Sequence, residues 1–117
     1  MILRMRFAAV LFGAALLAGC TSVSEGQWNT AQAVMQGSPA VKRDVIKGCV
    51  ARQIAKPLAE RKLESRVFNV ALDRLPSTYC NRLWNAVVKG RITYADYRNL
   101  WSSTADNSKV IKIMQGR

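Results

Sequence analysis

The residues of this chain that could take part in chemistry are three cysteines and seven carboxylates, and the chain contains no histidine. Acid–base and nucleophilic catalysis most often depend on histidine, and metal sites need clustered ligands. Several carboxylates stand directly beside a basic residue, as Asp44 does beside Arg43 and Asp73 beside Arg74. Solvated ion pairs on helix surfaces explain this arrangement better than paired catalytic carboxylates. The sequence therefore predicts a protein that is not an enzyme and holds neither a metal nor a dissociable cofactor.

Cys20 stands at the end of an apolar run that follows Arg4 and Arg6, and Leu17-Ala18-Gly19 comes directly before it. A charged start, an apolar stretch and small residues before a cleavage site are the parts of a secretory signal. The apolar run is too short for a transmembrane helix, which needs about 20 apolar residues. With the cysteine in this place, residues 1–20 resemble the lipobox signal of bacterial lipoprotein precursors. The resemblance does not extend to the mature domain.

The resemblance implies that residues 1–19 are a signal peptide, cleaved before Cys20. It also implies diacylglycerol on the Cys20 sulfur and a fatty acid such as palmitate on the new amino group. Each buried methylene contributes about 0.8 kcal/mol, so two or three acyl chains anchor a protein stably. In such lipoproteins an Asp directly after the cysteine tends to retain the protein in the inner membrane, whereas this chain has Thr21. The implied location is the outer membrane, facing the periplasm, in preference to the inner membrane.

Cys49 and Cys80 then remain as a pair in an oxidising compartment, where disulfides form and persist. A bridge between them would close a loop of about 30 residues and contribute roughly 3–4 kcal/mol in the chain-entropy model. The alternative is two buried free thiols. Because the pair lacks Cys-x-x-Cys spacing, thiol exchange is not predicted.

The mature chain would have 98 residues, enough for one small domain, and a formal charge of +9. In the cytoplasm this charge would suggest nucleic acid, but a secreted chain rarely meets that partner. The anionic surfaces of the envelope are phospholipid headgroups, lipopolysaccharide phosphates, peptidoglycan carboxylates and acidic proteins. The other interpretation is that the charge serves solubility alone.

Hydrophobic periodicity and capping signals predict an all-α fold of four to five short helices. Residues 20–37 read as the lipidated N-terminus and tether, with a short helix over 28–36 as an option, and residues 38–117 as the helical domain. Ser38-Pro39 is a strong helix start, and Lys56-Pro57 ends that helix. A second helix runs from Pro57 to about Val70. Its end could also form a strand, but one strand without a partner is not viable.

The clearest helix follows the caps Ser77 and Thr78 and ends at Gly90, with apolar residues at helical spacing over three turns. The residues after Gly90 look like the second half of an EF-hand calcium loop. Val87 and Lys89 would then occupy ligand positions, which excludes calcium binding. Thr93 and a carboxylate three residues later instead predict a capping box.

The residues predicted to form an interaction surface are aromatic and basic. A last full helix after Thr93 should carry the aromatic residues, and a short basic amphipathic segment over 109–114 should dock against the domain. The candidate residues are Tyr94, Tyr97, Arg98, Trp101, Lys109 and Lys112. The predicted function is a non-catalytic binding or assembly module of the cell envelope. The alternative is a basic structural protein that binds lipopolysaccharide or peptidoglycan directly.

Overall fold

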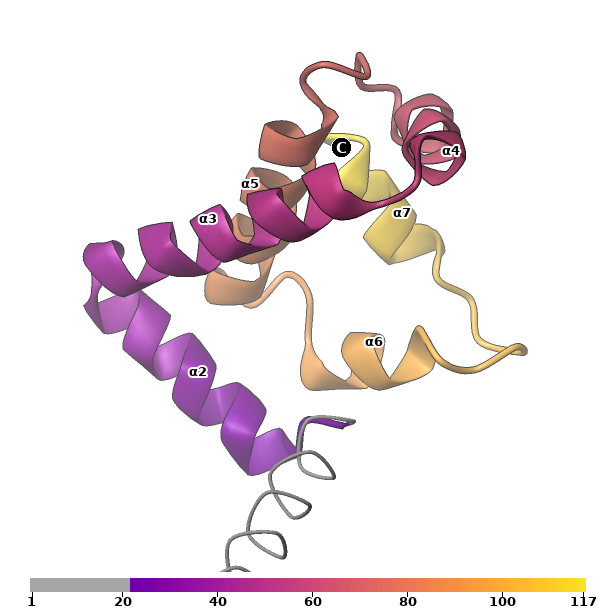
Figure 1. The fold of residues 1–117 in the computed structure, drawn as a ribbon. Helices are drawn as coiled ribbons and strands as arrows, with labels where there is room; N and C mark the ends of the chain where they lie inside the picture. Colours follow the sequence, from indigo (N-terminus) through magenta and orange to yellow (C-terminus); the bar gives the residue numbers. More distant parts are fainter. Residues whose placement is uncertain (1–21) are drawn as a thin grey trace, which may run out of the picture. The chain divides into compact units, whose positions relative to one another are not determined.

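The computed structural model describes residues 22–117, and this part of the chain is helical with no strand (Figure 1). The described helices are α2 (Glu25–Gly37), α3 (Pro39–Ala55), α4 (Leu58–Phe68), α5 (Leu75–Val88), α6 (Tyr94–Asn99) and α7 (Ser108–Met114). The all-α prediction is confirmed. The expected number of four to five helices is too low, because the segment predicted as a tether also forms a helix. The predicted signal peptide and Cys20 lie outside the described residues.

The helix α2 begins earlier than the short helix considered for residues 28–36. Ser24 and Gln27 explain this start, because each satisfies the backbone N–H of the other. The Gln27 N–H donates to Ser24 Oγ at 3.2 Å, and the Ser24 N–H donates to Gln27 Oε1 at 3.0 Å. This reciprocal pair is a capping box. The chain divides into two compact units between Thr30 and Ala31.

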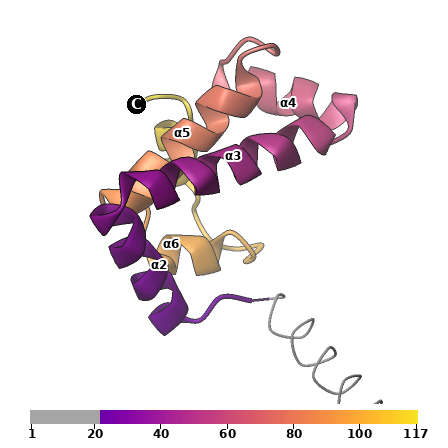
Figure 2. The same cartoon turned by 60° about the vertical axis from the view of Figure 1, so that its left-hand side comes forward.

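The unit Ala31–Arg117 is built around the packing of α3 against α5, which is the most extensive helix contact (Figure 2). The α3 start is as predicted, since Ser38 Oγ accepts from the Val41 N–H at 3.3 Å. Helix α5 starts at Leu75, two residues before the expected caps, because Leu75 is fully buried and Pro76 fits the first turn. The buried apolar residues are Met35, Cys49, Leu75, Cys80, Ala86, Val87, Ile92, Ile113 and Met114.

Helices α4 and α7 complete this unit, and both contact α5 and each other. Phe68 at the end of α4 packs against Tyr79 of α5, with ring centroids 5.8 Å apart. From α7, the Gln115 amide donates to the Val67 carbonyl at 2.9 Å. Asn69 ends α4 in the left-handed conformation, with φ of 53°. The predicted helix running into a turn is therefore what the structure has, and no strand forms there.

Within residues 22–117, no helix combines the length and the apolar character needed to cross a lipid bilayer.

Candidate basic binding site

An open hollow between the end of α5 and α7 is lined almost entirely by cations. Its volume is about 470 Å³, and its lining residues are Arg91, Lys109, Lys112, Ile113 and Arg117. Two of these residues, Lys109 and Lys112, belong to the interaction surface predicted from the sequence. None of the lining residues is acidic. We call this site the basic hollow.

Two helix ends of the same design bring Arg91 and Arg117 to the basic hollow. After α5, Gly90 adopts φ of 75°, and the Arg91 N–H donates to the Ala86 carbonyl at 2.8 Å. After α7, Gly116 adopts φ of 81°, and the Arg117 N–H donates to the Lys112 carbonyl at 2.9 Å. The glycine N–H groups donate to Val87 and Ile113, at 3.1 and 2.9 Å. Both ends are thus Schellman motifs, in which glycine takes the left-handed position.

The Arg91 side chain also reaches the chain segment that contains Arg117. Arg91 Nη2 donates to the Arg117 carbonyl at 2.9 Å, although the two residues are 26 positions apart. Arg82 of α5 donates in the same way to the Met114 carbonyl of α7, at 2.8 Å. The Met114 carbonyl belongs to the last turn of α7, where an arginine is favourable because the C-terminal end of a helix carries partial negative charge. These bonds fix the walls of the basic hollow.

A second, smaller hollow of about 220 Å³ adjoins the first, and the two share Arg91 and Ile113. Its remaining lining residues are Asn81, Arg82, Asn85, Ala86, Lys89 and Gly116. Amide and cationic side chains again supply the polar atoms, and no carboxylate lines this hollow. The cationic surface therefore continues along α5 beyond the basic hollow.

The carboxylate nearest to this surface is already engaged. Asp96 of α6 lies 2.6 Å from Lys109 Nζ, and its Oδ2 accepts from the Thr93 N–H at 2.8 Å. Partial burial favours the protonated acid, but the bonds from Lys109 and Thr93 outweigh it, so the pKa of Asp96 lies below its ordinary value. Among the described residues, Arg91, Lys112 and Arg117 have no Asp or Glu side chain within 4.0 Å. These three cations of the basic hollow thus form no ion pair with an Asp or Glu side chain of the described residues.

The Thr93–Asp96 pair also confirms the capping box predicted for α6, since the Asp96 N–H donates to Thr93 Oγ1 at 3.2 Å. The helix it starts is shorter than expected. It ends at Asn99, so Leu100 and Trp101 lie beyond it. Trp101, two residues after the end of the helix, is 79% exposed.

The aromatic residues predicted for the interaction surface form a ring series along α6. The Tyr94 and Tyr97 ring centroids are 6.0 Å apart, and Trp101 meets Tyr97 edge-on at 6.4 Å. Tyr94 and Tyr97 are half-buried, whereas Arg98 is exposed. Because Asp96 of the same helix binds Lys109, this aromatic series is tied to one wall of the basic hollow. The Asp96–Lys109 ion pair therefore links the predicted aromatic residues of α6 to the predicted basic residues of α7.

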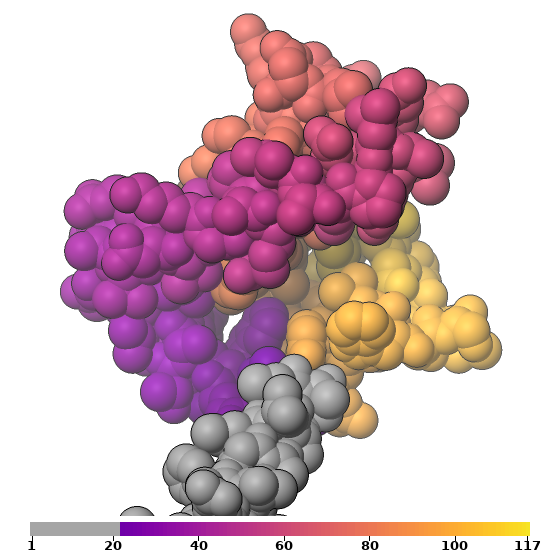
Figure 3. Space-filling view, in the orientation of Figure 1, coloured from indigo at the N-terminus to yellow at the C-terminus, as the bar shows by residue number. Residues whose placement is uncertain are grey.

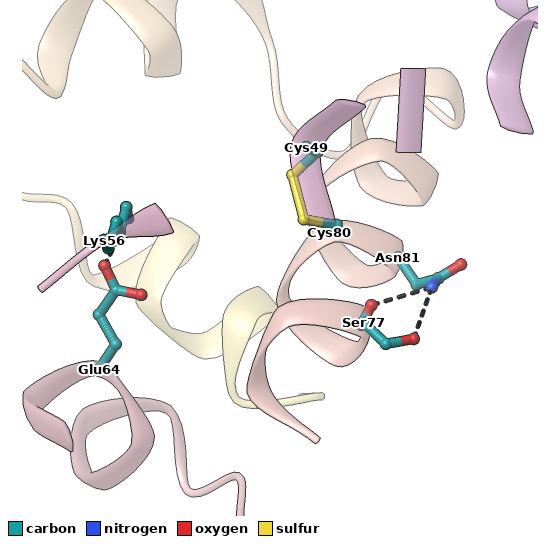
Figure 4. The surroundings of a disulfide bond; sticks show 6 residues. All are labelled: Cys49, Lys56, Glu64, Ser77, Cys80 and Asn81. Atoms are coloured by element: carbon teal, nitrogen blue, oxygen red, sulfur yellow. Dashed lines mark hydrogen bonds and ion pairs between the residues drawn. A yellow bond between two sulfur atoms is a disulfide. The ribbon is translucent and has the colours of Figure 1, made fainter. Parts of the chain in front are cut away.

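The cysteines predicted as a pair form a disulfide between α3 and α5 (Figure 4). The Cα atoms of Cys49 and Cys80 are 5.8 Å apart, and both residues are buried. The bridge crosses the main helix contact of the unit and lies apart from the basic hollow. It stabilises the fold that positions α5, and α5 in turn carries Arg82 and leads into Arg91.

The sequence reasoning missed Arg91 and Arg117 as members of the site. The signal that could have found them is the Gly-Arg pair that follows both α5 and α7. The described residues contain no cluster of three or more His, Cys, Asp or Glu that could hold a metal ion.

The described unit is thus a small all-α domain with one disulfide and a cationic surface hollow. No protein-family model matches the chain, and neither a curated protein nor a solved structure matches it significantly.

Proposed function

We propose that this chain is a small lipid-anchored, non-catalytic binding module of the bacterial cell envelope, which holds an anionic partner in the basic hollow. The observation that carries the proposal is that four of the five lining residues are basic, the fifth is an isoleucine, and none is Asp or Glu. Such a surface attracts anions and repels cations over about a Debye length. The lipobox-like segment ending at Cys20 supports the anchor and the outer-membrane location.

The aromatic series favours a protein as the partner. Trp101 exposes 79% of its surface and packs edge-on against Tyr97 of α6, the helix whose Asp96 pairs with Lys109. Tryptophan, tyrosine and arginine are the residue types most enriched at the energetic centres of protein interfaces. An acidic surface patch next to an apolar pocket would complement both features at once. We therefore infer docking of an acidic envelope protein.

Photo-crosslinking in bacterial cells tests this function. A benzoylphenylalanine is placed at position 112 or 101 of the full chain, and a matched control places it at the exposed Val41 of α3. A discrete crosslinked protein from positions 112 and 101, absent from position 41, is the expected result. The same abundant proteins crosslinked from all three positions would count against a docked partner.

The alternative is a basic structural protein that binds lipopolysaccharide phosphates or peptidoglycan carboxylates directly. Arg91, Lys112 and Arg117 favour it, because they form no ion pair with an Asp or Glu side chain and need only an anionic group rather than an apolar pocket. It predicts co-sedimentation with the purified envelope component that weakens steeply between low and high salt. Co-sedimentation that does not change with salt would contradict it.

A further inference from the structure

Helix α4 turns its apolar residues outward. Leu63 is 56% exposed and Val67 is 42% exposed, although both are residue types usually found in cores. The residues of α4 with intermediate burial are Arg61, Glu64, Ser65 and Phe68. The side of α4 that faces the protein is therefore largely polar, and its apolar side is not covered by the described unit.

Polar bonds with the end of α3 fix this orientation. Glu64 Oε1 lies 2.6 Å from Lys56 Nζ, and the side chains of this pair are only 16% and 28% exposed. Oriented by its hydrogen bonds, the buried Gln53 amide donates to Glu64 Oε2 at 3.1 Å and accepts from Lys56 at 3.0 Å. Arg61 Nε donates to the Lys56 carbonyl at 3.1 Å. Rotating α4 to bury Leu63 would break all of these bonds.

Most exposed residues of α4 lie in two parallel rows, because positions four apart are neighbours on a helix, and the exposed Glu60 borders these rows. One row is Ala59, Leu63 and Val67, and the other is Leu58, Lys62 and Arg66. Both carboxylates of α4 lie on a third row, where Glu60 and Glu64 are each within 4.0 Å of Lys56. Figures 1 and 3 show α4 at the upper right of the view. The outward rows therefore combine leucine and valine with two cations and no acid.

We propose that the outward face of α4 is a second membrane contact, which lays Leu63 and Val67 into the interface of an anionic phospholipid bilayer. Lys62 and Arg66 then lie at the height of the headgroup phosphates. Interfacial helices combine an apolar side with basic residues in this way. A second copy of the chain fits less well, because both faces would carry the same cations, and the unit from Ala31 has 16 Lys and Arg against 6 Asp and Glu. The inference goes beyond the proposed function and uses its lipid anchor only to bring α4 near the bilayer.

A polarity-sensitive fluorescent amino acid at position 63 or 67 of the full, lipidated chain tests this contact. The control carries the same residue at Val41, which is 37% exposed on α3. In phosphatidylglycerol-containing vesicles we expect the emission from positions 63 and 67 to shift to the blue. The emission from position 41 should not shift. Each cation near an anionic surface changes the docking equilibrium about fivefold, so Lys62→Gln with Arg66→Gln should weaken docking roughly 25-fold.

Emission from position 63 that is the same in anionic vesicles and in detergent would overturn the proposal. So would a blue shift that grows with protein concentration in detergent, because a second copy would then cover the face. Flotation with purely zwitterionic vesicles reports the lipid anchor separately. A chain that does not float with zwitterionic vesicles contradicts the proposed lipid anchor. The emission from position 63 in anionic vesicles still tests whether α4 contacts the bilayer.

Discussion

Breaking the Cys49–Cys80 disulfide should remove a large part of the stability of this domain. The bridge joins residues 31 positions apart. In the chain-entropy model, a loop of this length restricts the unfolded state by about 4 kcal/mol at 25 °C. Small domains have a net unfolding free energy of only about 5–15 kcal/mol. The described core is also modest, with Leu75 and Cys80 as its largest fully buried side chains.

Urea unfolding of residues 20–117 carrying Cys20→Ser, followed by circular dichroism with and without reductant, measures this contribution. With a urea m value of about 1–2 kcal/mol/M, the midpoint should fall by roughly 2–4 M on reduction. The matched control, Cys49→Ala with Cys80→Ala, should not respond to reductant. It should also be no more stable than the reduced chain, because each substitution removes a buried sulfur. A midpoint that moves by less than about 0.5 M would refute the reasoning.

Three further predictions concern the helix ends and the ion pairs. Gly90→Ala should lower the unfolding free energy by about 1–2 kcal/mol, since only its left-handed backbone opposes a side chain. Gly116→Ala should cost more, because its new Cβ would lie 2.9 Å from Arg82 Nη2 and would displace the guanidinium that donates to the Met114 carbonyl. Urea midpoints that are equal for the two variants, or lower for Gly90→Ala, would contradict this order. Glu64→Gln should destabilise the fold by about 1–3 kcal/mol, because the half-buried Lys56 would keep only the longer, exposed pair with Glu60. Glu60→Gln should have little effect in the same assay, because that pair is exposed. Because the pKa of Asp96 is lowered in the folded state, its contribution to stability is complete above its ordinary pKa of 3.8. That contribution is lost as the pH falls through the pKa of the folded state. Acid unfolding of Asp96→Asn should therefore lack the loss of stability that the titration of Asp96 causes.

The features that the sequence predicted correctly depend on residues close together in the chain. Ser38-Pro39 specifies the start of α3, and Thr93 with Asp96 specifies the start of α6. Each signal acts within one helical turn, so no knowledge of the packing is needed. The start of α2 follows the same rule, because the pair Ser24 and Gln27 was present in the sequence but was interpreted as part of a tether.

The basic hollow and the orientation of α4 depend on packing between distant segments. Arg91 and Arg117 meet only because α5 and α7 pack together, although each follows a helix-ending glycine. For α4, periodicity alone would place Leu63 inside. The bonds that Glu64 makes with Lys56 and Gln53 instead hold the polar side of the helix inward. These contacts cross between helices, and the local pattern does not specify them.

The measurement that tests the account most directly is the intact mass of the protein purified from bacterial membranes, taken with and without reduction. The account predicts the mass of residues 20–117 plus acyl groups, with two hydrogens gained on reduction of Cys49 and Cys80. That result would establish both the anchor and the disulfide. An unprocessed chain of residues 1–117 with free thiols would contradict the account, because neither the envelope location nor its anionic partners would then follow.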